Sequence, residues 1–174
     1  MLKYLVIGLI TLAALGCEKN EKESPTVRVR ILHQSDTVRV DFLGNWSIVV
    51  ANGADNLEAE TLRFKKGSSL ELIVGEESIS LQQEEQVFKA DSWILMPDEE
   101  AELLIEKVPY GVGWWWEGSE DRIYQDTLMV HLNQQKGLDV VLHAPMERYL
   151  LGVVPYEIGA DAPLEALKAQ AVAA

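Results

Sequence analysis

The feature of this sequence that most constrains its fold is an alternation of apolar and polar residues that begins at Thr26. The segment TVRVRIL (26–32) carries two valines and an isoleucine at every second position, with two arginines between them. A helix would scatter these side chains around its surface, whereas a strand sorts them onto one apolar and one polar face. The segment therefore predicts a strand of a sheet that buries one face.

Similar segments follow along the chain, separated by turn signals such as Lys66-Gly67-Ser68, Gly75 and Pro97-Asp98. The stretch 82–90, QQEEQVFKA, also suits a short helix. The expected strands are 26–32, 36–42, WSIVV (46–50) before an Asn52-Gly53 turn, 61–64, 70–74, 78–81, 92–96 and 101–106, followed by IYQDTLMVHL (123–132) and GLDVVLHAP (137–145).

After Pro145 the pattern becomes helical, and Gly152 is expected to end the first helical turn. Pro163 suits the first position of a second helix of strong helix formers. No stop signal follows AQAVAA, so the chain is expected to be a fragment that ends inside this helix. The predicted fold class is α+β, with a β-rich region over 26–108 and the start of an α+β domain, incomplete at its carboxy end, over 109–174.

The amino end resembles a bacterial lipoprotein signal. Lys3 precedes an apolar run from Tyr4 to Leu15 that is too short to span a bilayer, and the run leads to Cys17, the only cysteine. The resemblance implies a signal peptide over 1–16, a lipid on Cys17 and an extracytoplasmic, membrane-anchored protein. The alternative is an ordinary secretory signal with an incidental cysteine. Residues 17–25 are charged after the cysteine and are expected to form a flexible tether.

Charge limits the possible partners. The chain has 28 Asp and Glu against 15 Lys and Arg, a formal net charge of -13. Binding to a phosphate backbone requires clustered Lys and Arg, so no nucleic-acid partner is expected. The histidines are His33, His131 and His143, and their spacing is not that of metal ligands. We therefore expect neither a metal nor a cofactor.

The most specific motif is MERYLLGVVPYEIGADAPLEALKAQAVAA, at the carboxy end. It resembles the signature of the SpoIID/LytB family, which comprises stage II sporulation protein D, the amidase enhancer LytB and their relatives. Tyr156 departs from the pattern, in which a small residue is common, and is a candidate substrate-binding residue. The matching residues are Tyr149, Leu150, Gly152, Val153, Val154, Glu157 and 165–174.

The resemblance implies a protein that acts on peptidoglycan in cell-wall remodelling or sporulation. In the family's lytic transglycosylases the motif glutamate, here Glu157, is the catalytic acid. The C6 hydroxyl of muramic acid then attacks C1 and gives a 1,6-anhydro product, so one carboxyl group suffices. Apolar surroundings keep such an acid protonated because they disfavour its charged form. The residues that flank Glu157 in the sequence are apolar, so we expect such surroundings here.

Two alternatives to this catalytic role remain open. In the first, Glu157 is structural and caps a helix or forms a salt bridge. In the second, the protein is a non-catalytic module that binds glycan strands and stimulates a cell-wall amidase, because the amidase-enhancer branch shares the motif.

Four further residues are expected to contact the substrate. Lys168 would hold a glycan hydroxyl or carboxylate, and Gln170 would bridge the helix to a loop; alternatively, Lys168 forms a surface pair with Glu165. Trp114 and Trp116, in GVGWWWEG, are candidates for stacking on sugar rings. On a strand they would instead share one face and cover the β-core.

Overall fold

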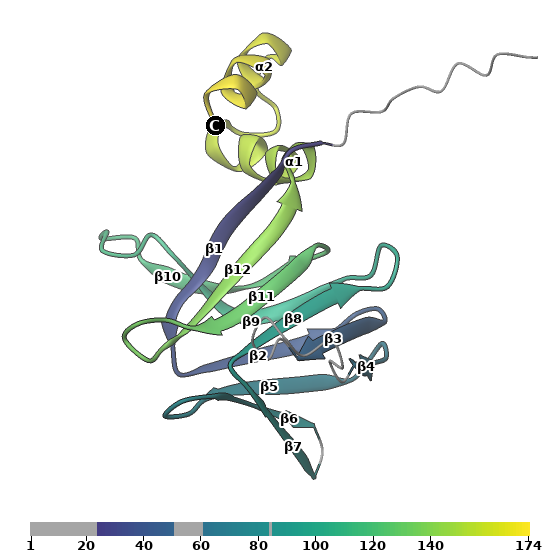
Figure 1. The fold of residues 1–174 in the computed structure, drawn as a ribbon. Helices are drawn as coiled ribbons and strands as arrows, with labels where there is room; N and C mark the ends of the chain where they lie inside the picture. Colours follow the sequence, from purple (N-terminus) through teal and green to yellow (C-terminus); the bar gives the residue numbers. More distant parts are fainter. Residues whose placement is uncertain (1–23, 51–60, 84) are drawn as a thin grey trace, which may run out of the picture.

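The computed structural model describes residues 24–50, 61–83 and 85–174. Cys17 and the expected Asn52-Gly53 turn lie outside these ranges. Within them the chain forms strands first and then two helices (Figure 1). The elements are β1 (Thr26–Ser35), β2 (Thr37–Phe42), β3 (Trp46–Val50), β4 (Thr61–Phe64), β5 (Ser69–Val74), β6 (Ile79–Gln83), β7 (Gln86–Ala90), β8 (Ser92–Pro97), β9 (Leu103–Tyr110), β10 (Gly118–Tyr124), β11 (Thr127–Leu132), β12 (Leu138–Pro145), α1 (Met146–Ile158) and α2 (Leu164–Ala173).

The strands form two six-stranded sheets. The first has the order β1-β12-β11-β8-β3-β4 and the second the order β10-β9-β2-β5-β6-β7. Every pairing between the described strands is antiparallel, and apolar residues face each other across it, as Val40 does with Leu70 on one side and Ile105 on the other. The α+β class is confirmed, with strands in the majority.

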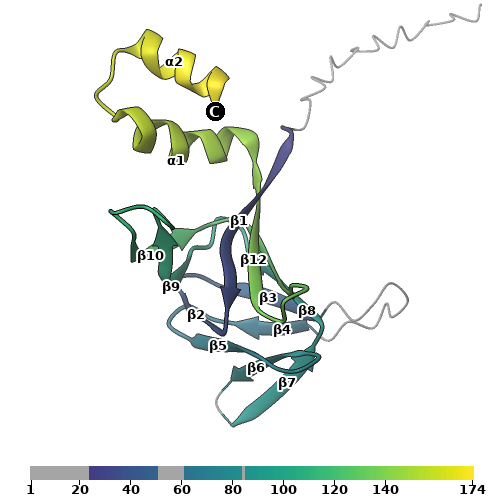
Figure 2. The same cartoon turned by 90° about the vertical axis from the view of Figure 1, so that its left-hand side faces the viewer.

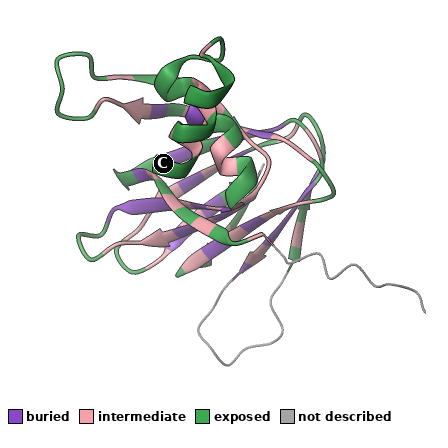
Figure 3. Cartoon of the chain, turned by 90° about the horizontal axis from the view of Figure 1, so that it is seen from above, coloured by how far each residue is buried: buried purple, intermediate pink, exposed green. Residues whose placement is uncertain are grey.

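One hydrophobic core draws on both sheets. Its largest fully buried side chains include Trp46 and Trp93. Their indole N–H groups donate to the backbone carbonyls of Glu102 and Ile79, at 3.0 Å and 3.2 Å, so the buried donors are satisfied. In Figure 3 the buried positions lie mainly on the strands, whereas the helices are largely exposed.

Most of the expected strands are confirmed, with ends that shift by up to four residues. Strand β9 runs to Tyr110 rather than to residue 106, and β10 begins at Gly118, where no strand was expected. Residues 86–90 form strand β7, so the helical alternative for 82–90 is wrong. The segment 123–132 is divided at Gln125 and Asp126, because Tyr124 ends β10 in the second sheet and Thr127 begins β11 in the first. The chain crosses between sheets at this point, which a continuous apolar pattern does not reveal.

Helix α1 is longer than expected. It runs through Gly152, so the expectation that this glycine ends the helix is wrong. The helix ends instead at Ile158, and its C-cap is Gly159, whose φ of 86° favours glycine and whose N–H donates to the Pro155 carbonyl at 2.9 Å. This extension places Glu157 in the last turn of α1. Helix α2 follows as expected, although Pro163 is its N-cap rather than its first residue.

The strand pairings cross residue 108. Strands β11 and β12 lie in the same sheet as β1, β3, β4 and β8, so one core contains residues from both sides of the expected division at 108/109. That division stays a prediction of domain organisation. Helix α1 follows β12 directly, and the two helices lie above one end of the sheets (Figure 2). Neither helix of the described chain has the length and apolarity needed to cross a membrane.

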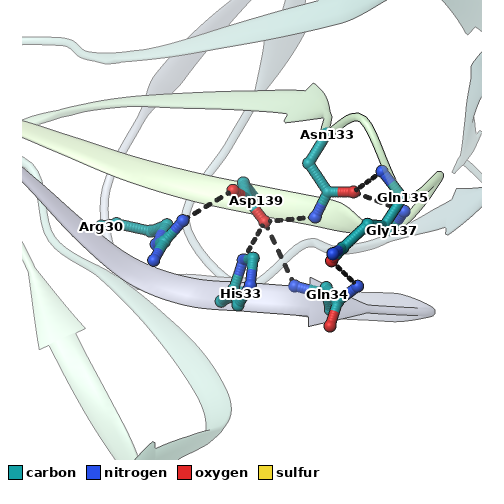
Figure 4. A network of polar contacts seen from close by, with 7 residues as sticks. All are labelled: Arg30, His33, Gln34, Asn133, Gln135, Gly137 and Asp139. Atoms are coloured by element: carbon teal, nitrogen blue, oxygen red, sulfur yellow. Dashed lines mark hydrogen bonds and ion pairs between the residues drawn. The ribbon is translucent and has the colours of Figure 1, made fainter.

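A buried carboxylate joins β1 to β12 and to the turn before β12 (Figure 4). The Asp139 side chain is 6% exposed, and its Oδ1 accepts hydrogen bonds from Asn133 Nδ2 at 2.8 Å and from the Gln34 N–H at 3.1 Å. His33 Nδ1 lies 2.8 Å from the same oxygen, and an Arg30 guanidinium nitrogen lies 3.4 Å from Oδ2. Burial acts to raise the pKa of Asp139, but the hydrogen bonds from Asn133, His33 and Gln34 outweigh it and lower the pKa to about 2.

Candidate functional site

A groove with a volume of about 850 Å³ lies between α1, β10 and the apolar face of β1 and β12. The β10 and α1 sides carry polar and aromatic side chains beside the aliphatic Ile123 and Val153, whereas the β1 and β12 side is aliphatic. The floor is formed by Val29, Ile31, Leu142 and Ala144; the β10 side by residues 120–126; and the α1 side by Arg148, Tyr149, Gly152, Val153, Tyr156 and Glu157.

Glu157 lines this groove from the last turn of α1. Its Oε2 accepts a hydrogen bond of 2.6 Å from Gln170 Nε2, so the expected bridging role of Gln170 connects α2 to α1 rather than to a loop. The apolar enclosure expected around Glu157 is not formed, because this residue is exposed. The carboxylate sits at the helix end that disfavours negative charge, and the Gln170 amide compensates by donating to it.

Lys168 lies apart from the groove lining. Its Nζ is 2.9 Å from Glu165 Oε1, and both side chains are largely exposed. The surface-pair alternative therefore describes its contact in this structure. A contact between Lys168 and a substrate stays a prediction.

Tyr156 faces a cation from the opposite wall. The guanidinium carbon of Arg122, on β10, lies 5.8 Å from the centre of the Tyr156 ring, within the range of a cation–π contact. Arg122 Nε also donates to Glu120 at 2.7 Å. The departure from the family pattern at Tyr156 therefore supplies an aromatic contact between α1 and β10.

Sequence reasoning missed a second ion pair in the groove. Arg148, on α1, donates to Asp126 Oδ1 at 2.7 Å, and the Asp126 side chain is 12% exposed. Burial raises the pKa of Asp126, and the neighbouring Arg148 opposes the rise. Asp126 lies within a segment expected to be one strand, so no sequence pattern marked it as a site residue. Its position between the two sheets depends on the tertiary fold.

The tryptophans lie outside the groove. Trp114 and Trp116 belong to the loop between β9 and β10 and are exposed, so the alternative that they cover the β-core is wrong. Among the described residues that line the groove none is a tryptophan. Sugar stacking by these two side chains stays a prediction.

No cluster of metal-ligating side chains is present in the described parts of the chain: no three or more His, Cys, Asp or Glu residues there are placed to hold an ion. The groove lining offers carboxylates, arginines and tyrosines.

Fold and groove define a β-rich protein with an open groove of mixed polar and apolar lining beside a carboxy-terminal helical motif. Residues 134–174 match the model of the SpoIID family, described as a stage II sporulation protein. This match confirms the resemblance read from the sequence and indicates a protein related to sporulation or the cell wall. No curated protein and no solved structure matches the chain.

The match covers β12, α1 and α2 and includes Glu157, Lys168 and Gln170. Strand β10, which forms the other wall of the groove, lies outside it. The groove therefore combines residues inside the family match with residues outside it.

Proposed function

We propose that this protein binds glycan strands of peptidoglycan in the groove between α1 and β10, and that it is a lytic transglycosylase with Glu157 as its general acid and base. One observation supports the proposal: Glu157, which lies within the family match, lines the groove, and its carboxylate accepts a hydrogen bond from Gln170. An acid in this position can reach a polymer lying along an open groove.

The chemistry requires one titrating side chain. Protonated Glu157 donates its proton to the glycosidic oxygen as the bond from C1 to that oxygen breaks. The resulting carboxylate then accepts the proton of the muramic acid C6 hydroxyl while O6 bonds to C1. The products are a 1,6-anhydromuramic end and a new free hydroxyl on the neighbouring sugar, and no water is consumed.

The walls of the groove carry side chains that can contact a carbohydrate. Tyr149 and Tyr156 offer aromatic faces, and Arg122 and Arg148 offer guanidinium donors for sugar hydroxyls or for the acidic groups of peptidoglycan. Both arginines already contact carboxylates of the protein, so a ligand would share or replace these partners.

A second function is favoured by one observation, the exposure of Glu157. A general acid benefits from surroundings that disfavour its charged form, and an exposed carboxylate lacks them. In this alternative the groove binds glycan strands without cleaving them, and the protein stimulates a cell-wall amidase.

We also propose that the protein is exported and anchored by a lipid on Cys17. The motif leading to this cysteine supports the proposal, and the charged segment that follows it would form a tether between the lipid and β1. Such an anchor would keep the groove next to the cell wall.

The test replaces Glu157 with glutamine, which keeps the size of the side chain but cannot deliver a proton. Glu147→Gln is the matched control, because Glu147 lies on the same helix, is exposed and does not line the groove. Each protein is incubated with purified sacculi, and the digested products are separated by chromatography and scored for 1,6-anhydromuramic ends.

The expected result is that Glu157→Gln lowers the rate of formation of these ends by roughly 100- to 10,000-fold. Binding to glycan strands should persist, and Glu147→Gln should match wild type. Wild-type rates from Glu157→Gln would rule out catalysis by Glu157. The enhancer alternative predicts no anhydro ends from any of the three proteins, together with stimulation of an added amidase.

A further inference from the structure

The hairpin of β9 and β10 ends in an apolar loop, residues 111–117, which we call the tryptophan tip. Trp115 is 93% exposed, and Val112, Trp114 and Trp116 are also exposed. Figures 1 and 2 show this hairpin projecting from the sheets. Isolated exposed apolar residues need no explanation, but four within five positions form a patch that marks an interaction surface.

The backbone of the tip is held in one conformation. The Trp114 N–H donates to the Gly111 carbonyl at 2.9 Å, the Glu117 N–H donates to the Trp114 carbonyl at 3.0 Å, and the Gly113 N–H donates to Glu117 Oε2 at 2.9 Å. Gly111 and Gly113 have φ values of 61° and 82°, which disfavour other residues. A loop ordered before binding loses little conformational entropy when it binds.

The base of the tip is packed as well. The Trp116 ring stacks on Tyr110, with ring centres 6.4 Å apart and an angle of 18° between the planes. A Cβ at Gly111 would lie 2.4 Å from the Trp116 ring, so glycine is required for this packing. Trp116 thus fixes the loop, while Trp114 and Trp115 extend into solvent.

The chemistry of the tip fits a bilayer surface. Tryptophan combines a large apolar ring with one N–H donor, and it is enriched where hydrocarbon meets headgroups. None of the three indole N–H groups has a hydrogen-bond acceptor within the described residues. The exposed aliphatic side chain of Val112 adds apolar surface to the tip and has no hydrogen-bonding group for a sugar hydroxyl. We infer that the tryptophan tip inserts into the lipid–water interface of a membrane.

Charge indicates which lipids the tip prefers. Residues 111–117 contain no Lys or Arg, and their one acidic side chain, Glu117, accepts the Gly113 N–H. The whole chain has a formal net charge of -13. Insertion therefore depends on apolar contact, and anionic lipids should weaken it at low salt through repulsion that added salt screens. This inference is independent of the proposed reaction at Glu157.

Tryptophan fluorescence tests the inference at the tip itself. The chain has 5 tryptophans; Trp46 and Trp93 are fully buried, and the other three form the tip. The full chain is mixed with phosphatidylcholine vesicles, with and without bromine on the acyl chains. Quenching by brominated lipid reports tryptophans that touch the acyl chains, and the exposed tryptophans are those of the tip. Membrane contact by a segment without tryptophan does not by itself cause quenching.

We expect vesicles to shift the emission to shorter wavelength and brominated lipid to quench it. Both effects should be lost in Trp114→Ser/Trp115→Ser, whose two side chains are exposed, and retained in Val87→Ser, which removes an exposed apolar side chain from β7. If the double variant does not fold, Trp115→Ser alone should lose the larger part of both effects.

Three outcomes would overturn the inference. The first is the absence of quenching by brominated lipid in wild type. The second is equal quenching in wild type and in the tip variants. The third is an emission change produced by soluble glycan strands without vesicles and without lipid quenching, which would assign the tip to sugar binding.

Discussion

Replacing Asp139 with asparagine should remove a contribution to the stability of the fold that is present at neutral pH and is lost in acid. The carboxylate is buried and accepts hydrogen bonds from Asn133 and the Gln34 N–H, with His33 and Arg30 beside it. A pKa lowered from 3.8 to about 2 corresponds to about 2 kcal/mol of folding free energy at neutral pH. The side-chain amide of an asparagine would point its own N–H donors at the donors that surround Asp139, such as the Arg30 guanidinium and the Asn133 amide. The loss of unfolding free energy should therefore be at least this large.

The direction of the pH dependence follows from the lowered pKa. Between about pH 2 and 4 the unfolded chain binds a proton on Asp139 that the folded chain does not bind. The contribution is therefore complete above pH 4 and is lost as the pH falls through about 2. The difference in unfolding free energy between wild type and Asp139→Asn should shrink over this window.

Urea denaturation at several pH values between 2 and 7, followed by the fluorescence of the buried tryptophans, measures this difference. Glu165→Gln is the control, because this carboxylate is 82% exposed and its loss should change stability by less than about 0.5 kcal/mol. A constant difference between wild type and Asp139→Asn from pH 7 to pH 2 would refute the reasoning.

Three further predictions concern other parts of the molecule. Leu72→Ala should lower the unfolding free energy by about 2 to 5 kcal/mol in urea denaturation, because Leu72 is fully buried between the sheets; a loss under about 1 kcal/mol would contradict the described core. Arg148→Ala should raise the pKa of Asp126 further, since it removes the cation that opposes the effect of burial. NMR titration of the Asp126 carboxyl carbon measures this pKa, and an unchanged pKa in the variant would contradict the prediction. Cys17→Ser should abolish a diacylglycerol modification, and mass spectrometry of wild type that finds an unmodified Cys17 in the mature protein would contradict the proposed anchor.

Part of the candidate site could be predicted from the sequence. Glu157 and Gln170 belong to a local motif, 13 residues apart, and the structure joins them by a hydrogen bond. The opposite wall could not be predicted, because Arg122 and Asp126 come near α1 only through the pairing of β10 with β9 and of β11 with β12. The exposure of Glu157 was also beyond local reasoning, since apolar neighbours in sequence need not be neighbours in space.

The sequence by itself determined most of the strands, because an alternation of period two is a local property that only an extended chain can convert into one apolar face. It also determined the carboxy-terminal helices and their motif. Only the tertiary structure decided how the strands divide between two sheets and where Asp139 finds its partners. His33 and Gln34 lie 106 and 105 residues from it in the chain and meet it across the pairing of β1 with β12. Such contacts arise because burying apolar faces brings distant strands together, and the polar groups that are carried inside must then satisfy one another.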